Sequence, residues 1–182
     1  MLLQIAKLGN PILRKLSEPV TPDELLDPAT QRLIDDMIET MRDADGIGLA
    51  APQVFVSRRI QVLEIRANPR YPTAPSFPLM VLANPEIEPL TDQLIEAWEG
   101  CLSVDNLRGK VRRPAAVAVR YLDRYGEARE FEFEGFPAVV VQHETDHLFG
   151  KLFLDRMSDM STLTQMREWE RYWLTEQVMV AD

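Results

Sequence analysis

Cysteine and histidine are nearly absent from this sequence of 182 residues, which contains one cysteine, Cys101, and two histidines, His143 and His147. A lone cysteine cannot close an internal disulfide, a composition typical of proteins in a reducing compartment. No apolar run approaches the roughly 18 residues that a membrane span requires. The first residues lack the charged leader and cleavage site of a signal peptide. These absences predict a cytoplasmic protein without a membrane anchor.

Basic residues are also scarce relative to acidic ones. The chain has 20 lysines and arginines against 29 aspartates and glutamates, which gives a net charge of -9. This balance argues against nucleic acid binding through a broad basic surface. Hydrophobic residues make up 46% and charged residues 27%, the mixture of a globular protein that can bury a core. We expect one domain over residues 1–182.

Three helices are predicted from local patterns. Apolar residues recur at helical spacing over residues 28–43, where Asp27 is a suitable N-cap and Pro28 suits the first turn. A second helix is expected to begin at Gly135-Phe136-Pro137 and to end at Gly150. A third, amphipathic helix is expected over residues 161–178.

Outside the three predicted helices, most patterned segments are predicted to be strands. Alternating or apolar runs predict strands at residues 60–65, 80–83, 94–98, 115–122, 129–133 and, shorter, 152–154. Asp123-Arg124-Tyr125-Gly126 resembles a hairpin turn, and four prolines between residues 67 and 78 indicate a loop. Strands followed by one central helix, without β-α-β alternation, predict an α+β fold. We expect antiparallel or mixed sheets packed around that helix.

The two histidines are the first and last residues of the segment His143-Glu144-Thr145-Asp146-His147 within the predicted central helix. Residues four apart lie on one helical face, so both imidazoles could bind one metal ion and Glu144 could act on a water beside it. A surface helix whose histidines are merely exposed to solvent could have the same sequence. Catalytic sites of this kind usually need a third protein ligand. A distant carboxylate or Cys101 could supply it, although a lone cysteine is more often a small buried apolar residue.

A glycine-rich segment, residues 46–53 (GIGLAAPQ), follows the first predicted helix. It lacks the third glycine and the strand-to-helix setting of a dinucleotide loop. It is therefore either a turn that ends the helix or a backbone wall along which a substrate chain passes, with Gln53 as a hydrogen-bond donor.

Three segments together resemble the motifs of the polypeptide deformylase family: residues 46–53 (GIGLAAPQ), 99–103 (EGCLS) and 142–147 (QHETDH). The similarity extends from about residue 5 to residue 153. It implies one divalent metal ion bound by Cys101, His143 and His147 with a water as fourth ligand. Ferrous iron is the expected native ion, and zinc, nickel or cobalt could also occupy the site. The implied reaction is hydrolysis of the formyl group of N-terminal formyl-methionine, with release of formate.

The resemblance also implies roles for individual residues. Glu144 would take a proton from the attacking water and pass it to the leaving amine, while the Gln53 amide and the Leu102 backbone N–H would stabilise the oxyanion. Further side chains are implied to bind substrate or to orient the metal ligands. The substrate-binding set is Ile47, Gly48, Leu49, Gly100, Arg108 and Val139, and the orienting set is Glu99, Arg113 and Asp146.

The implied partners are nascent formyl-methionyl peptides and, transiently, the ribosome, although residues 161–182 have too mixed a charge to predict strong ribosome anchoring. Asp105, Arg112 and Thr145 depart from residues common in the family. Two other functions fit parts of the pattern. A zinc endopeptidase would use Asp155 or Asp159 as its third ligand. A non-enzymatic binding module on the same fold would lack Cys101, Glu144 or Gln53, and none of these is missing.

Overall fold

The computed structural model describes residues 1–71 and 74–174. Its strands form two antiparallel sheets, one of five strands in the order β1-β2-β3-β6-β7 and one of three in the order β4-β5-β8. The bounds of the strands are β1 Gly48–Ala50, β2 Ile60–Ile65, β3 Phe77–Pro89, β4 Leu94–Cys101, β5 Val104–Pro114, β6 Ala116–Leu122, β7 Ala128–Glu134 and β8 Thr164–Gln165. The helices are α1 Pro22–Leu26, α2 Pro28–Asp43, α3 Phe136–Leu148 and α4 Met166–Tyr172, with 3-10 turns at Pro11–Arg14, Ala51–Val54, Phe153–Arg156 and Met160–Thr162.

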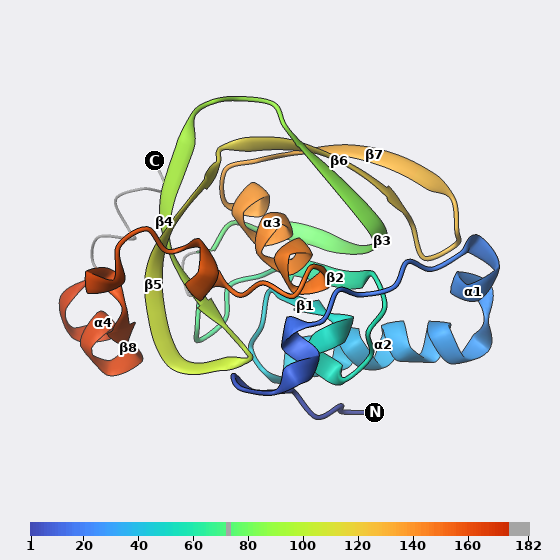
Figure 1. Ribbon diagram of the computed structural model, residues 1–182, viewed down its shortest axis with the longest axis horizontal. Helices are drawn as coiled ribbons and strands as arrows, with labels where there is room; N and C mark the ends of the chain where they lie inside the picture. Colours follow the sequence, from blue (N-terminus) through green and yellow to red (C-terminus); the bar gives the residue numbers. More distant parts are fainter. Residues whose placement is uncertain (72–73, 175–182) are drawn as a thin grey trace.

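Helix α3 lies in the centre of the molecule, enclosed by both sheets (Figure 1). It contacts β1, β2, β3 and β7 of the larger sheet and β5 of the smaller one. Gly135 precedes it with φ +63°, and Gly150 follows it with φ +69°. These left-handed conformations favour glycine and allow the chain to enter and leave the helix sharply. Every residue from Ala138 to Leu148 is buried, so polar side chains on this helix must find partners inside the protein.

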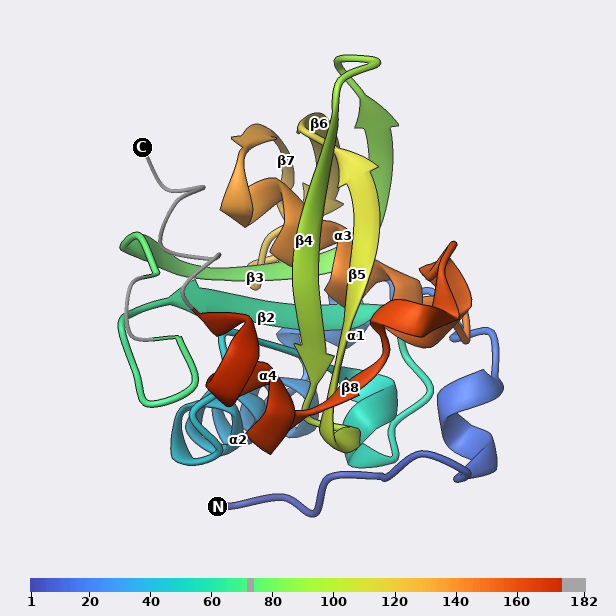
Figure 2. The same cartoon turned by 90° about the vertical axis from the view of Figure 1, so that its left-hand side faces the viewer.

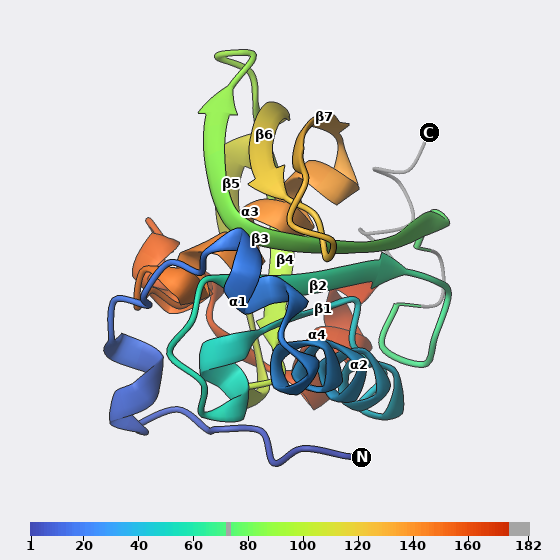
Figure 3. The same cartoon turned by 90° about the vertical axis from the view of Figure 1, so that its right-hand side faces the viewer.

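Helix α2 packs along the edge of the larger sheet near β1 and β2 (Figure 3). The Asp27 side chain accepts a hydrogen bond from the Ala29 N–H and caps its first turn. Its apolar face buries Ile34, Met37 and Met41 completely against Leu49 and Val62. In the other sheet, the long β4–β5 ribbon crosses the direction of β2 and β3 (Figure 2). The cleft described below lies between the two sheets.

The predicted α+β class is confirmed, and so are the helix over residues 28–43 and the central helix. The strands predicted at 60–65, 115–122 and 129–133 are present within one residue of the expected bounds. The one predicted at 80–83 lies inside the longer strand β3, and the one predicted at 94–98 is the first part of β4. Asp123–Gly126 forms the expected turn, with a hydrogen bond from the Gly126 N–H to the Asp123 carbonyl. Among the described residues, no helix is long and apolar enough to cross a membrane.

The structure differs from the predicted elements in several places. Residues 152–154 do not form a strand, because the Leu152 N–H donates to Asp155 Oδ2 and the chain turns into a 3-10 helix. Strand β5 was not predicted, since its glycine and its many charged residues hide the alternation. The helix expected over 161–178 begins only at Met166, after a 3-10 turn and the short strand β8. Its part from 175 to 178 lies outside the described residues.

Candidate metal centre and active site

Cys101, at the end of β4, lies beside His143 and His147 of α3. All three residues are buried, and one ligand atom from each can be chosen so that the three lie within 4.8 Å of one another. Cys101 Sγ is 3.3 Å from His147 Nε2. In the described part of the chain, Glu144 Oε2 is buried without a hydrogen-bond partner. A thiolate and two imidazoles beside an unpartnered carboxylate oxygen form a donor set that fits a divalent transition metal and a water.

Hydrogen bonds favour the thiolate form of Cys101. The Ser103 N–H and Gln53 Nε2 each donate to Cys101 Sγ at 3.4 Å, and Gln53 Oε1 accepts from the Ala50 N–H at 2.8 Å, which orients the amide. Burial alone would raise the pKa of the thiol. The two neighbouring imidazoles outweigh burial and hold that pKa well below its ordinary value.

A buried chain of charges supports the metal-binding face of α3. His143 Nδ1 lies 2.8 Å from Glu99 Oε2, which leaves the other ring nitrogen for the ligand cluster. Arg113 binds Glu99 through Nε and Nη2 at 2.6 and 3.0 Å and binds Asp146 Oδ2 through Nη1 at 2.9 Å. Arg156 donates to the same Asp146 carboxylate. The contact between Arg113 and Asp146 is the one that the resemblance implies, whereas nothing in the sequence pattern indicated Arg156.

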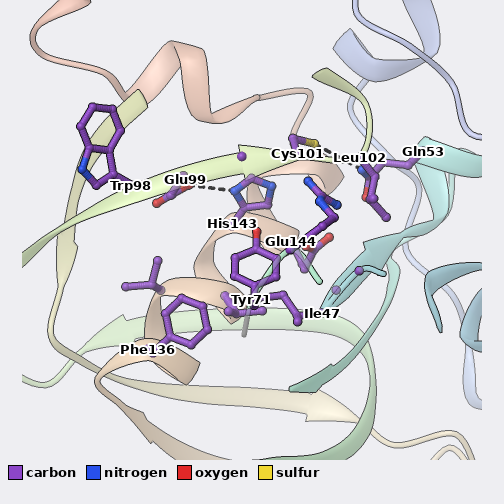
Figure 4. Close-up of a pocket in the computed structure, with 16 residues that line it drawn as sticks. Ile47, Gln53, Tyr71, Trp98, Glu99, Cys101, Leu102, Phe136, His143 and Glu144 are labelled. Atoms are coloured by element: carbon purple, nitrogen blue, oxygen red, sulfur yellow. Dashed lines mark hydrogen bonds and ion pairs between the residues drawn. The ribbon is translucent and has the colours of Figure 1, made fainter. Parts of the chain in front are cut away.

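Glu144 points from α3 toward β1 (Figure 4). A Cβ atom added at Gly48 would lie only 2.6 Å from Glu144 Cγ, so β1 can pass this close only with glycine at that position. Burial raises the pKa of the Glu144 carboxyl above its ordinary value. A carboxyl with a raised pKa is better suited to accept a proton and return it near neutral pH.

A cleft opens in front of these groups (Figure 4). Of the residues predicted to contact substrate, Ile47, Gly48, Gly100 and Val139 line it, as does Leu102. Leu49 does not; its side chain is fully buried in the core beneath α2. Gly46, the first residue of the glycine-rich segment, also lines the cleft. Further lining residues that no sequence pattern indicated are Arg70, Tyr71, Trp98, Phe136 and Val140.

Arg108 is absent from the lining of this cleft, and its side chain is fully buried. Its guanidinium contacts the rings of Tyr71 and Trp169, with its central carbon 4.9 and 4.7 Å from the two ring centroids. The side chain therefore lies behind the cleft wall.

The three departures from the family pattern each have local partners. Lys7 Nζ binds Asp105 Oδ1 at 2.7 Å and Arg112 Nε binds Glu96 Oε2 at 2.9 Å, both on the surface. Thr145 is buried, and its hydroxyl oxygen lies 3.1 Å from Gln61 Oε1.

Neither aspartate of the endopeptidase alternative belongs to the metal-ligand group found in the described residues. Asp155 pairs with Arg14 and the Leu152 N–H, and Asp159 caps the turn at Ser161.

Comparisons with known proteins point to one family. Residues 2–162 match the family model described as polypeptide deformylase. A peptide deformylase of Leptospira biflexa is 46% identical over 155 residues, covering 85% of this chain and 87% of the relative. Peptide deformylase 2 of a Nostoc species is 44% identical over 165 residues, 90% and 91% of the two chains.

Solved structures agree as well. A class I type b peptide deformylase from Acinetobacter baumannii with Met-Ala-Ser bound has a TM-score of 0.83 and 44% identity, over 86% of this chain and 99% of that one. The Thermotoga maritima peptide deformylase has a TM-score of 0.77 and 38% identity, over 87% and 99%. With its motifs joined in one buried cluster, this chain belongs to the polypeptide deformylase family of enzymes.

Proposed function

We propose that this chain hydrolyses the formyl group from the N-terminal formyl-methionine of newly made polypeptides and releases formate. The observation that carries the proposal is the buried cluster of Cys101, His143 and His147 with the unpartnered Glu144 Oε2 beside it. Family membership supports the reaction, and the Acinetobacter relative with Met-Ala-Ser bound supports a peptide as substrate.

Cys101, His143 and His147 would hold one divalent ion, with ferrous iron as the expected native metal. Such an ion supplies Lewis-acid chemistry, because it lowers the pKa of water and polarises a carbonyl oxygen. Glu99 and Arg113 keep the His143 ring oriented through the 2.8 Å contact at Nδ1.

Glu144 is the proposed proton carrier. It would accept a proton from the attacking water and deliver it to the amine of methionine as the formyl C–N bond breaks. The Gln53 amide, next to Cys101 Sγ, and the Leu102 backbone N–H would donate hydrogen bonds to the developing oxyanion. Gly48 allows Glu144 to lie close to the backbone that the substrate follows.

Strand β1 is the proposed template for the peptide. It is an edge strand of the larger sheet and, among the described strands, pairs only with β2, so its other side can accept an extended chain. The methionine side chain would enter the cleft between Ile47, Val139 and Phe136. The flexible, unbranched thioether side chain of methionine suits a pocket with these apolar walls.

Formate release from formyl-Met-Ala-Ser tests the function directly. The purified chain, loaded anaerobically with iron and in separate preparations with nickel and with cobalt, should release one formate per peptide, as expected for a single hydrolytic site. The same peptide without its formyl group should stay intact, which separates this activity from an endopeptidase. Absence of formate with all three metals would overturn the proposal.

Replacing Glu144 by alanine tests the proton carrier. The variant should bind metal like the parent and lose roughly 10²- to 10⁴-fold in kcat, the usual contribution of a general base. The exposed Glu86→Ala change is the matched control and should leave kcat unchanged. A Glu144→Ala enzyme with near-normal turnover would show that another group carries the proton.

A further inference from the structure

Helix α4 lies beyond the family match, which ends at residue 162. The short strand β8 before it pairs with β5, where Gln165 lies opposite Leu107 and Thr164 opposite Arg108. This pairing brings α4 against the β4–β5 ribbon that forms one wall of the cleft (Figure 2). Trp169 within this helix and Trp173 directly after it contact residues behind or in the cleft wall.

The first contact is between Trp169 and Arg108. Trp169 is 2% exposed, and the Arg108 guanidinium carbon lies over its ring, 4.7 Å from the centroid, as well as over the Tyr71 ring at 4.9 Å. In the described part of the chain, Arg108 makes only long hydrogen bonds to neutral groups and pairs with no carboxylate. Its position therefore depends on the two rings, because stacking over an aromatic face is the favourable contact left to a desolvated guanidinium.

Arg108 in turn supports the backbone of the cleft. A Cβ atom added at Gly100 would lie 3.2 Å from Arg108 Cδ and Nε, so the arginine stem packs directly behind this glycine. Gly100 lines the cleft next to Cys101. Loss of the Trp169 ring would free Arg108 to move and would remove the support behind Gly100.

The second contact is between Trp173 and Trp98. Their ring centroids are 5.9 Å apart with the planes inclined by 39°. Trp98 lines the cleft and is 6% exposed, whereas Trp173 is 39% exposed and covers it from outside. Aromatic pairs of this kind restrict ring orientation beyond what area burial gives.

We propose that Trp169 and Trp173 are positioning residues that set the affinity of the cleft for its peptide. They hold Arg108 behind Gly100 and hold Trp98 in the lining, and neither is part of the metal-ligand cluster. The inference rests on the proposed deformylase function for the identity of the peptide. It predicts an effect on substrate binding and not on proton transfer.

Steady-state kinetics of Trp169→Ala and Trp173→Ala with formyl-Met-Ala-Ser test this inference. Trp169→Ala should raise KM roughly tenfold, an effect of the size expected from a desolvated cation–π contact, and leave kcat within about twofold. Trp173→Ala should raise KM less, because Trp173 is partly exposed. Trp169→Phe, which keeps an aromatic face, should restore most of the affinity. Tyr172→Ala, on the exposed side of the same helix, is the matched control and should leave KM unchanged.

Calorimetric binding of the product peptide Met-Ala-Ser to the metal-loaded variants gives the affinity without turnover. It should weaken in parallel with KM, while metal content per chain stays at the parental value. Parental KM and parental peptide affinity in both tryptophan variants would overturn the inference, as would a loss confined to kcat. A parent that binds Met-Ala-Ser but releases no formate would contradict the proposed function and still leave this inference testable by binding.

Discussion

Thr145 and Gln61 form a buried polar contact between α3 and β2. The Thr145 hydroxyl oxygen lies 2.8 Å from the Val141 carbonyl oxygen and 3.1 Å from Gln61 Oε1. Gln61 is fully buried. A polar residue at position 145 is thus accommodated because β2 supplies a polar partner at the same depth.

Replacing Thr145 by valine should destabilise the protein by about 1–3 kcal/mol, since the buried Gln61 amide loses a partner that water cannot replace. Urea unfolding at neutral pH measures this change. The double variant Thr145→Val with Gln61→Met should cost clearly less than the sum of the two single changes, because no unsatisfied group remains. Additive costs would show that the two side chains do not interact.

At the scale of elements, the turn between β6 and β7 depends on one carboxylate. Asp123 Oδ1 accepts from the N–H groups of Tyr125 and Glu127 at 2.9 and 3.1 Å, and Arg129 Nε donates to Oδ2 at 3.0 Å. Partial burial alone would raise the pKa of Asp123. The Glu127 N–H and the Arg129 guanidinium outweigh it, so that pKa lies below its usual value.

A lowered folded-state pKa means that the ionised Asp123 stabilises the fold above the unfolded pKa of about 3.9. This contribution is lost as pH falls through the lower folded-state value. Asp123→Asn should therefore cost about 1 kcal/mol at pH 7, and its difference from the parent should shrink below pH 4. Urea unfolding of both proteins at pH 7, 5, 4 and 3 measures this. A difference that stays constant over the series would contradict the assignment.

At the scale of the whole molecule, the ligand cluster joins the two sheets. Cys101 ends β4 of the smaller sheet, while His143 and His147 belong to α3, which packs mainly on the larger one. An ion held by all three would bind the folded chain far better than the unfolded one, and such binding stabilises the fold by mass action.

Removing the metal with a chelator should therefore lower Tm by roughly 10 °C, the shift expected for a chain of this length when ligand exceeds Kd about a thousandfold. Adding iron, nickel or cobalt back should restore the parental Tm. Calorimetry under anaerobic conditions measures both steps. Cys101→Ala should respond little to either treatment, and a full response in that variant would exclude the cysteine as a ligand.

Surface charge bears on the proposed transient contact with the ribosome. In α4, Arg167 and Arg171 alternate with Glu168 and Glu170, so the helix carries no net charge. With a chain charge of -9, this arrangement disfavours strong binding to a polyanion such as ribosomal RNA.

Local sequence determined the elements that form by short-range rules. The N-cap at Asp27, the glycines around α3 and the apolar periodicity of α2 depend on neighbours within a few residues, as does the shared face of His143 and His147. The three motifs also indicate the family, and the resemblance implies the metal ligands and the role of Glu144. The shared face of the two histidines is predictable because a helix places residues four apart side by side in any context.

Tertiary structure decided what depends on residues far apart in the chain. From the residues alone, Cys101 could have been an ordinary buried side chain, and only its approach to α3 places it at the cluster. Arg156 reaches Asp146, Leu49 turns into the core and Arg108 withdraws behind the cleft wall. Strand β5 forms although its own pattern is weak, because pairing with β4 and β8 satisfies its backbone. Such contacts are set by the packing of the two sheets around α3, which no local pattern encodes.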